Sequence, residues 1–122
     1  MGGRIIQATI GNLPELLRSG KPVAVDFWAS WCAPCHIMAP VLRSLSKEFQ
    51  GQIIFAKVDA QNNKDLTAQF NIKSIPTLVL FRNGKEWDRL TGVRGRSELR
   101  KLMKKLALQD MRDGENTEKE IV

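Results

Sequence analysis

Cys32 and Cys35 are the only cysteines in the 122-residue sequence, and Ala33 and Pro34 separate them. An apolar run ends just before this pair and a helical periodicity follows it, so we expect the pair at the first turn of a long helix, where Pro34 is well tolerated. Amides at a helix N-terminus favour a thiolate, and Cys-x-x-Cys motifs lower the thiol pKa from about 8.5. Two intervening residues leave the sulfurs within disulfide reach. The motif therefore predicts redox chemistry; two buried structural cysteines are the alternative.

A metal site is a second possibility for the same segment. Cys32, Cys35 and His36 offer three ligands, but structural zinc takes four, and the chain has no other Cys or His. We therefore expect no metal. His36 is expected to be a partly exposed cation that favours the Cys32 thiolate, or a solvated helix residue.

Two charged residues interrupt apolar runs that are typical of buried strands: Asp26 within residues 23–28 and Lys57 within residues 53–58. A buried charge is costly unless it is paired. If the two strands are parallel neighbours, the two side chains can approach each other on one face, behind the cysteines. Burial would raise the pKa of Asp26 and suit it to exchanging a proton with a thiol near neutral pH. An ordinary solvent-facing alternation is the alternative.

Pro76 stands directly before a further apolar run, in the segment Ser74-Ile75-Pro76-Thr77. A proline in that position is often only the first residue of a strand. Beside a redox pair, however, we expect a cis Ile75–Pro76 peptide bond, although only about 5–6% of X–Pro bonds in folded proteins are cis.

The hydrophobic pattern predicts alternating strands and helices that would position these residues. The first helix is expected to begin at Asn12, which forms a capping-box pattern with Glu15, and the last near an N-cap at Ser97. An Asn83-Gly84 turn predicts a hairpin. The order β-α-β-α-β-α-β-β-α predicts an α/β fold with about four helices on both faces of a mixed sheet of four to five strands, parallel at crossovers and antiparallel at the hairpin. Strands are expected over residues 5–10, 23–28, 53–58, 77–81 and 86–91, and the second and third helices over residues 33–49 and 62–70.

Composition indicates one globular domain, with 43% apolar and 26% charged residues. No apolar stretch approaches the roughly 20 residues that span a bilayer, and the first residues lack the apolar core of a signal peptide. We therefore expect a soluble, cytoplasmic protein without a membrane partner. We also expect a monomer, because no large apolar surface stripe is evident.

Charge is distributed unevenly along the chain. Residues 1–108 hold 17 Lys and Arg against 8 Asp and Glu, whereas residues 109–122 hold 2 against 5. The second segment has few apolar residues, so we expect a domain over 1–108 and an acidic, disordered tail over 109–122. The basic excess falls on an amphipathic helix at 97–108, with no interleaved aromatic residue or recognition motif. We expect a solvated cationic face rather than nucleic-acid binding.

From residue 5 to residue 108 the sequence resembles the thioredoxin family. The segment from Asp26 to Cys35 and the later Ile75-Pro76-Thr77 carry the resemblance, supported by Pro40, Lys57, Gly84 and Gly92. It implies a thioredoxin fold and a protein-disulfide reductase. Cys32 would be the attacking thiol and Cys35 the resolving thiol, with Asp26 as proton acceptor and donor assisted by Lys57. The implied substrate groove consists of Trp31, Ala33, Pro34, Ile75, cis Pro76 and Gly92.

The resemblance also implies partners. They are disulfide-containing proteins as substrates and, for re-reduction, a flavoprotein thioredoxin reductase that uses NADPH, with no bound cofactor. Two residues depart from the family pattern, because Ala33 replaces its usual glycine and His36 its usual lysine or arginine. Both could shift the reduction potential. These departures make a disulfide oxidase or isomerase of the same fold one alternative. The basic helix at 97–108 and the acidic tail make a binding or scaffold protein another.

Overall fold

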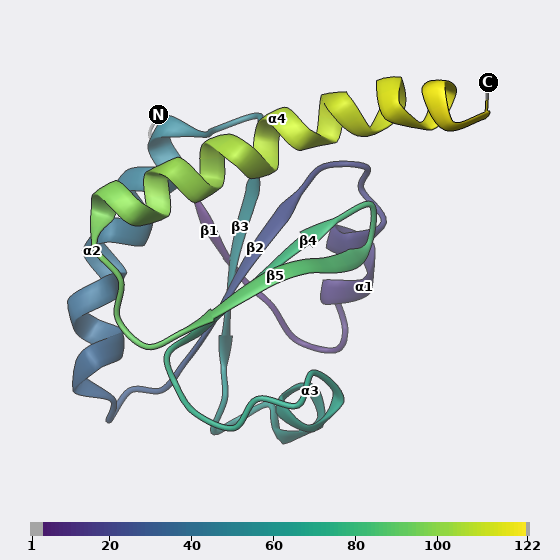
Figure 1. Ribbon diagram of the computed structural model, residues 1–122. Helices are drawn as coiled ribbons and strands as arrows, with labels where there is room; N and C mark the ends of the chain where they lie inside the picture. The colour runs from purple at the N-terminus through teal and green to yellow at the C-terminus, as the bar shows by residue number, and fades with distance from the viewer. Residues whose placement is uncertain (1–3, 122) are drawn as a thin grey trace.

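Five strands form one mixed sheet, and helices cover both of its faces (Figure 1). The structure is a computed structural model that describes residues 4–121, with side chains as far as residue 108. The strands are β1 (Ile5–Gln7), β2 (Val23–Trp28), β3 (Ile54–Asp59), β4 (Thr77–Arg82) and β5 (Lys85–Thr91). The helices are α1 (Leu13–Leu17), α2 (Ala33–Glu48), α3 (Lys64–Gln69) and α4 (Arg96–Ile121). The predicted element order is confirmed.

The sheet order is β1-β3-β2-β4-β5, which places β2 at the centre. β3 pairs in parallel with β1 and β2, whereas β4 is antiparallel to both β2 and β5. The prediction of parallel strands at every crossover is wrong for the connection through α3, because β4 runs antiparallel to β2. Helix length explains this strand direction. The 16 residues of α2 span about 24 Å and return the chain to the end of the sheet where β2 began, so β3 runs parallel to β2. The six residues of α3 span only about 9 Å. The chain therefore enters β4 near the end where β3 stops.

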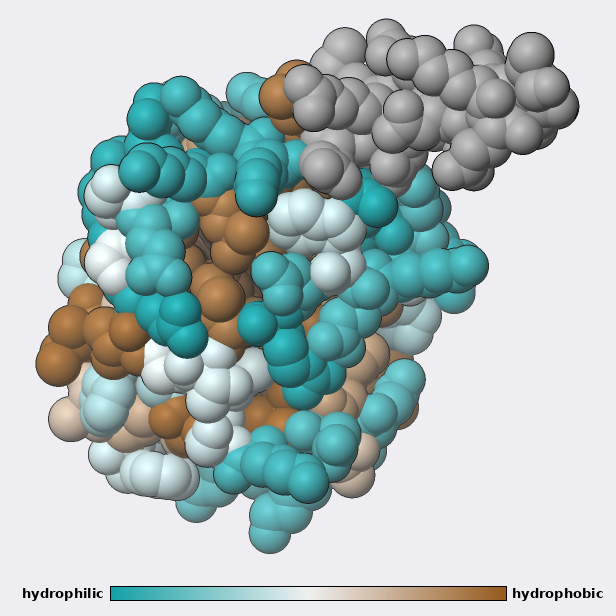
Figure 2. All heavy atoms as spheres, viewed as in Figure 1, coloured by the Kyte–Doolittle hydropathy of each residue, from teal (hydrophilic) through white to brown (hydrophobic). Residues whose placement is uncertain are grey.

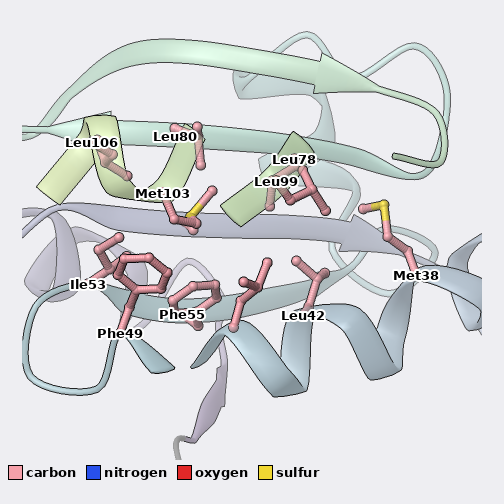
Figure 3. Close-up of a cluster of buried hydrophobic side chains, with 12 residues drawn as sticks. Met38, Leu42, Phe49, Ile53, Phe55, Leu78, Leu80, Leu99, Met103 and Leu106 are labelled. Atoms are coloured by element: carbon pink, nitrogen blue, oxygen red, sulfur yellow. The ribbon is translucent and has the colours of Figure 1, made fainter. Parts of the chain in front are cut away.

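Residues along β2 alternate between two apolar clusters on opposite faces of the sheet. Ala24 belongs to the cluster under α2 and α4, whereas Val23, Val25 and Phe27 belong to the cluster under α1 and α3. Figure 3 shows the first cluster, in which side chains of α2 and α4 converge on those of the strands. Since strand side chains alternate, Asp26 shares the face of Ala24, toward α2.

The amphipathic character predicted for α4 is confirmed. Leu99, Met103 and Leu106 are fully buried against the sheet. Figure 2 shows a largely hydrophilic surface over α4 and β5, with hydrophobic side chains in the hollow between them, which Leu90 and Leu102 line. The N-cap predicted at Ser97 is wrong, because α4 begins at Arg96.

Gly95 takes the place expected of Ser97. Its carbonyl accepts the first helical hydrogen bond, from the Leu99 N–H at 3.1 Å. Glycine tolerates the N-cap position well.

The capping box predicted at α1 is also wrong. Asn12 makes no side-chain cap hydrogen bond to the helix. Its Oδ1 accepts instead from the Thr9 N–H at 2.8 Å, and its Nδ2 donates to the Gln7 carbonyl at 2.9 Å. The side chain therefore closes the turn between β1 and α1. The hairpin at Asn83-Gly84 is confirmed, with φ of 54° and 77°.

The C-terminal segment carries predictions that stay open. The boundary after residue 108 and the disorder of residues 109–122 fall where no side chain is described. Within the described part of the chain, none of the helices has the length and apolar character needed to cross a membrane.

Leu106 and Leu108 offer a matched pair on α4, because Leu106 is fully buried and Leu108 is 50% exposed. We expect Leu106→Ala to lower the free energy of unfolding by about 2–5 kcal/mol, since it leaves a cavity in the core. Leu108→Ala should change it by less than about 0.5 kcal/mol. Denaturant unfolding of the oxidised variants measures both; equal losses would contradict the packing described for α4.

Candidate active site

The two cysteines form a disulfide at the N-terminus of α2, with their Cα atoms 5.3 Å apart. Cys32 is the N-cap residue, and its sulfur accepts a hydrogen bond from the Cys35 N–H at 3.2 Å. Pro34 lies in the first turn, where its missing N–H leaves no helical bond unmade. Both cysteines are buried. The helix-start position and disulfide reach predicted from the motif are confirmed.

The loop before β4 packs against this disulfide. The Ile75–Pro76 peptide bond is cis, as predicted, and the half-buried Ile75 packs against the cluster of Ala29, Cys32 and Cys35. The Gly92 N–H donates to the Pro76 carbonyl at 2.8 Å, which ties the start of β4 to the end of β5.

A groove of about 770 Å³ runs beside the disulfide. Among the residues predicted for a substrate groove, it is lined by Trp31, Ala33, Pro34 and Ile75; Pro76 and Gly92 do not line it. The prediction missed Gln61, Thr67, Ile72, Lys73 and Ser74, which also contribute. Thr67 comes from α3 and the others from the loops that flank this helix. Apart from Ser74, which belongs to the segment before β4, no motif in the sequence marks them. Trp31 is 69% exposed at the groove, so an apolar surface is available there.

Asp26 and Lys57 lie opposite each other in the parallel pairing of β2 and β3, as the sequence predicted. Asp26 is 8% exposed, and its Oδ1 has no hydrogen-bond partner among the described residues. Burial raises the pKa of Asp26 to about 7, and the opposing effect of the Lys57 charge is smaller. The carboxyl group can therefore both accept and donate a proton near neutral pH.

Lys57 contacts an aromatic ring that sequence reasoning did not single out. Its Nζ lies 5.3 Å from the centroid of the Trp28 ring, a cation–π geometry. Trp28 ends β2, directly before the turn that leads to the cysteines.

A cavity of about 410 Å³ lies behind the disulfide, on the α2 side of the sheet. Its lining includes Asp26, Cys35, His36 and Lys57. A space of this size with Asp26, His36 and Lys57 in its walls can hold water, so a proton path between Cys35 and Asp26 needs no direct contact. The sequence predicted the proximity of these groups but not the cavity.

His36 is exposed, and its Nε2 lies 2.7 Å from the Ser30 carbonyl oxygen. Its ring packs edge-on against Trp28, with 6.3 Å between centroids. Among the described residues no group of three His, Cys, Asp or Glu side chains could hold a metal ion. Ser30 was missed in the sequence, because its contribution is a backbone carbonyl.

A redox disulfide at a helix N-terminus, a cis proline beside it and a buried carboxyl behind it define a thiol–disulfide oxidoreductase. The sequence profile of the Thioredoxin family matches residues 5–105. The chain belongs to the thioredoxin family. It is a protein-disulfide reductase that acts by thiol–disulfide exchange, and the predicted fold and activity are confirmed.

Relatives and solved structures agree with this assignment. A thioredoxin of Chlorobaculum thiosulfatiphilum is 41% identical over 91 residues, which cover 74% of this chain and 84% of that protein. A bifunctional thioredoxin reductase/thioredoxin of Mycobacterium leprae is 42% identical over 85 residues, or 70% of this chain, but the match spans only 19% of that longer protein. The crystal structure of a Malassezia sympodialis thioredoxin superimposes with a TM-score of 0.80 at 27% identity, covering 86% of this chain and 92% of that one.

Burial of Asp26 predicts a pH-dependent stability. Between its ordinary pKa of 3.8 and about 7, folded Asp26 keeps a proton that the unfolded chain releases, so the free energy of unfolding falls as pH rises. From pH 5 to pH 8 this one group should lower it by roughly 2–3 kcal/mol. Asp26→Asn should remove that loss, so that the variant is more stable than wild type at pH 8 and the difference shrinks at pH 5. Denaturant unfolding of both oxidised proteins tests this; parallel pH profiles would refute the assignment.

Proposed function

We propose that Cys32 attacks the substrate disulfide and that Cys35 resolves the mixed disulfide. One observation supports this division of roles above all: Cys32 lines the groove at the surface, whereas Cys35 lines the cavity that contains Asp26. The sulfur that borders the groove is the one that a substrate reaches. The sulfur beside the buried carboxyl is the one whose proton can be removed internally.

The proposed reaction begins with reduced protein and an oxidised substrate. The Cys32 thiolate attacks one substrate sulfur, the substrate disulfide breaks, and the leaving thiolate takes a proton from solvent. The Asp26 carboxylate then accepts the proton of Cys35, through the cavity, and Lys57 supports the charge on Asp26. The Cys35 thiolate attacks the Cys32 sulfur and expels the second substrate sulfur as a thiolate, to which Asp26 returns the proton. Two electrons have passed to the substrate, and the protein holds a Cys32–Cys35 disulfide.

The groove suits an extended segment of a protein substrate. Trp31, Ala33, Pro34 and Ile75 give it apolar walls beside the Cys32 sulfur. In the proposal, cis Pro76 and Gly92 contribute indirectly, since the hydrogen bond between them fixes the loop that presents Ile75.

Re-reduction requires an electron donor, which we propose to be a thioredoxin reductase that draws on NADPH. The Mycobacterium leprae relative, named as a bifunctional thioredoxin reductase/thioredoxin, supports this pairing. The disulfide would be the only redox centre of this chain, with no bound cofactor. We further propose that the protein acts as a monomer in the cytoplasm, in electron transfer to protein disulfides.

Replacing each cysteine in turn tests the division of roles. Cys35→Ser should accumulate a mixed disulfide between Cys32 and the substrate, because no second thiol can release it. Cys32→Ser should form no adduct and show no turnover. Non-reducing electrophoresis and mass spectrometry with insulin as substrate measure both. Adducts through Cys35 in the Cys32→Ser protein, or full turnover by Cys35→Ser, would reverse the assignment.

The electron route is tested separately, by coupling insulin reduction to NADPH oxidation. We expect turnover with NADPH and a bacterial thioredoxin reductase together, and none when either is omitted. Dithiothreitol serves as the control donor, since it reduces the disulfide directly. Activity with dithiothreitol but not with any thioredoxin reductase would remove the proposed partner and leave the chemistry at the cysteines intact.

A further inference from the structure

His36 reaches back from the first turn of α2 to the turn that precedes it. Its Nε2 lies 2.7 Å from the Ser30 carbonyl oxygen. A carbonyl oxygen can only accept a hydrogen bond, so Nε2 must carry the proton. In neutral His36 the hydrogen is therefore on Nε2, and the bond needs no second proton on the ring.

The turn that receives this bond carries the Cys32 sulfur. It connects the end of β2 to α2, and the Cys32 N–H donates to the Ala29 carbonyl at 3.2 Å. The His36 N–H donates to the Cys32 carbonyl at 3.3 Å, as the first bond of the helix. The side-chain bond from His36 to Ser30 adds a third tie, between the middle of the turn and the helix.

The imidazole ring is held on its other side as well. It meets the Trp28 ring nearly perpendicularly, at an interplanar angle of 73°. Trp28 is half-buried at the end of β2 and is itself covered by Lys57. The ring therefore lies between a strand end and a turn.

We propose that His36 is a positioning residue that holds the Ser30–Cys32 turn through its Nε2–H···O bond, so that Cys32 stays at the helix N-terminus when the disulfide is open. In oxidised protein the Cys32–Cys35 bond already fixes the two ends of the first turn. In reduced protein that covalent link is gone, and the tie to Ser30 remains. The inference rests on the proposed role of Cys32 as the attacking thiol.

The bond itself is tested without reference to activity. His36 is the only histidine in the chain, so its ring nitrogens give a single set of NMR signals. Long-range ¹H–¹⁵N spectra of the reduced protein, recorded where His36 is neutral, should show the Nε2–H tautomer. A neutral ring protonated on Nδ1 would overturn the proposal, whatever the variants do.

The consequence for reactivity is tested with three variants. The side-chain nitrogen of Gln is the same number of bonds from Cβ as Nε2, whereas that of Asn is one bond shorter. His36→Gln should therefore keep the tie, and His36→Asn and His36→Ala should lose it. We expect the second-order rate of pre-reduced protein with insulin to fall roughly three- to tenfold in the last two variants, and to stay within about twofold of wild type in His36→Gln.

The design separates positioning from other effects. None of the variants carries a charge at residue 36, so a general effect of the imidazolium would slow all three equally and would overturn the proposal. Asp26, Lys57 and Arg43 line the same cavity as His36 and are present in every variant. The order of the variants by reaction rate should therefore be the same at pH 6 and at pH 8. A wild-type rate in His36→Ala would also overturn it. The rates are measured with chemically reduced protein, so they do not depend on whether a thioredoxin reductase is the electron donor. If Cys35 rather than Cys32 attacks the substrate, the cysteine-replacement experiment described above shows it.

Discussion

The Cys35 N–H that points at the Cys32 sulfur is the contact on which the site depends. It exists because α2 begins at Ala33, directly after a turn that ends the central strand. The backbone N–H groups of a first helical turn have no partner within the helix. Here they face the Cys32 sulfur and stabilise negative charge on it. The buried run of β2 fixes where the strand ends, and so where the turn that carries Cys32 begins.

The fold also maintains a buried carboxyl group at a cost. Asp26 is on the face of β2 that α2 covers, and its Oδ1 has no partner among the described residues. Such a group destabilises the folded state once it is ionised. The two apolar clusters supply the stability that offsets it. What the protein gains is a carboxyl group that titrates near neutral pH and lines the same cavity as Cys35.

Much of this arrangement follows from the sequence because it depends on local pattern. Apolar runs fix the strands, and the one charge in each of two runs predicts the pairing of Asp26 with Lys57. The antiparallel placement of β4 could not be predicted from the order of elements, since it depends on the length of α3 relative to the strands. The tie from His36 to Ser30 is equally invisible, because any residue at position 30 would supply the same carbonyl.

The central claim is that helix amides make the Cys32 thiolate easy to form. Titration of the reduced protein by thiolate absorbance, repeated in Cys35→Ser to isolate one sulfur, measures this directly. The structure predicts that Cys32 ionises with a pKa below the value of about 8.5 for a free thiol. Ionisation at or above that value would contradict the account, because the helix N-terminus would then contribute nothing to the chemistry of the sulfur.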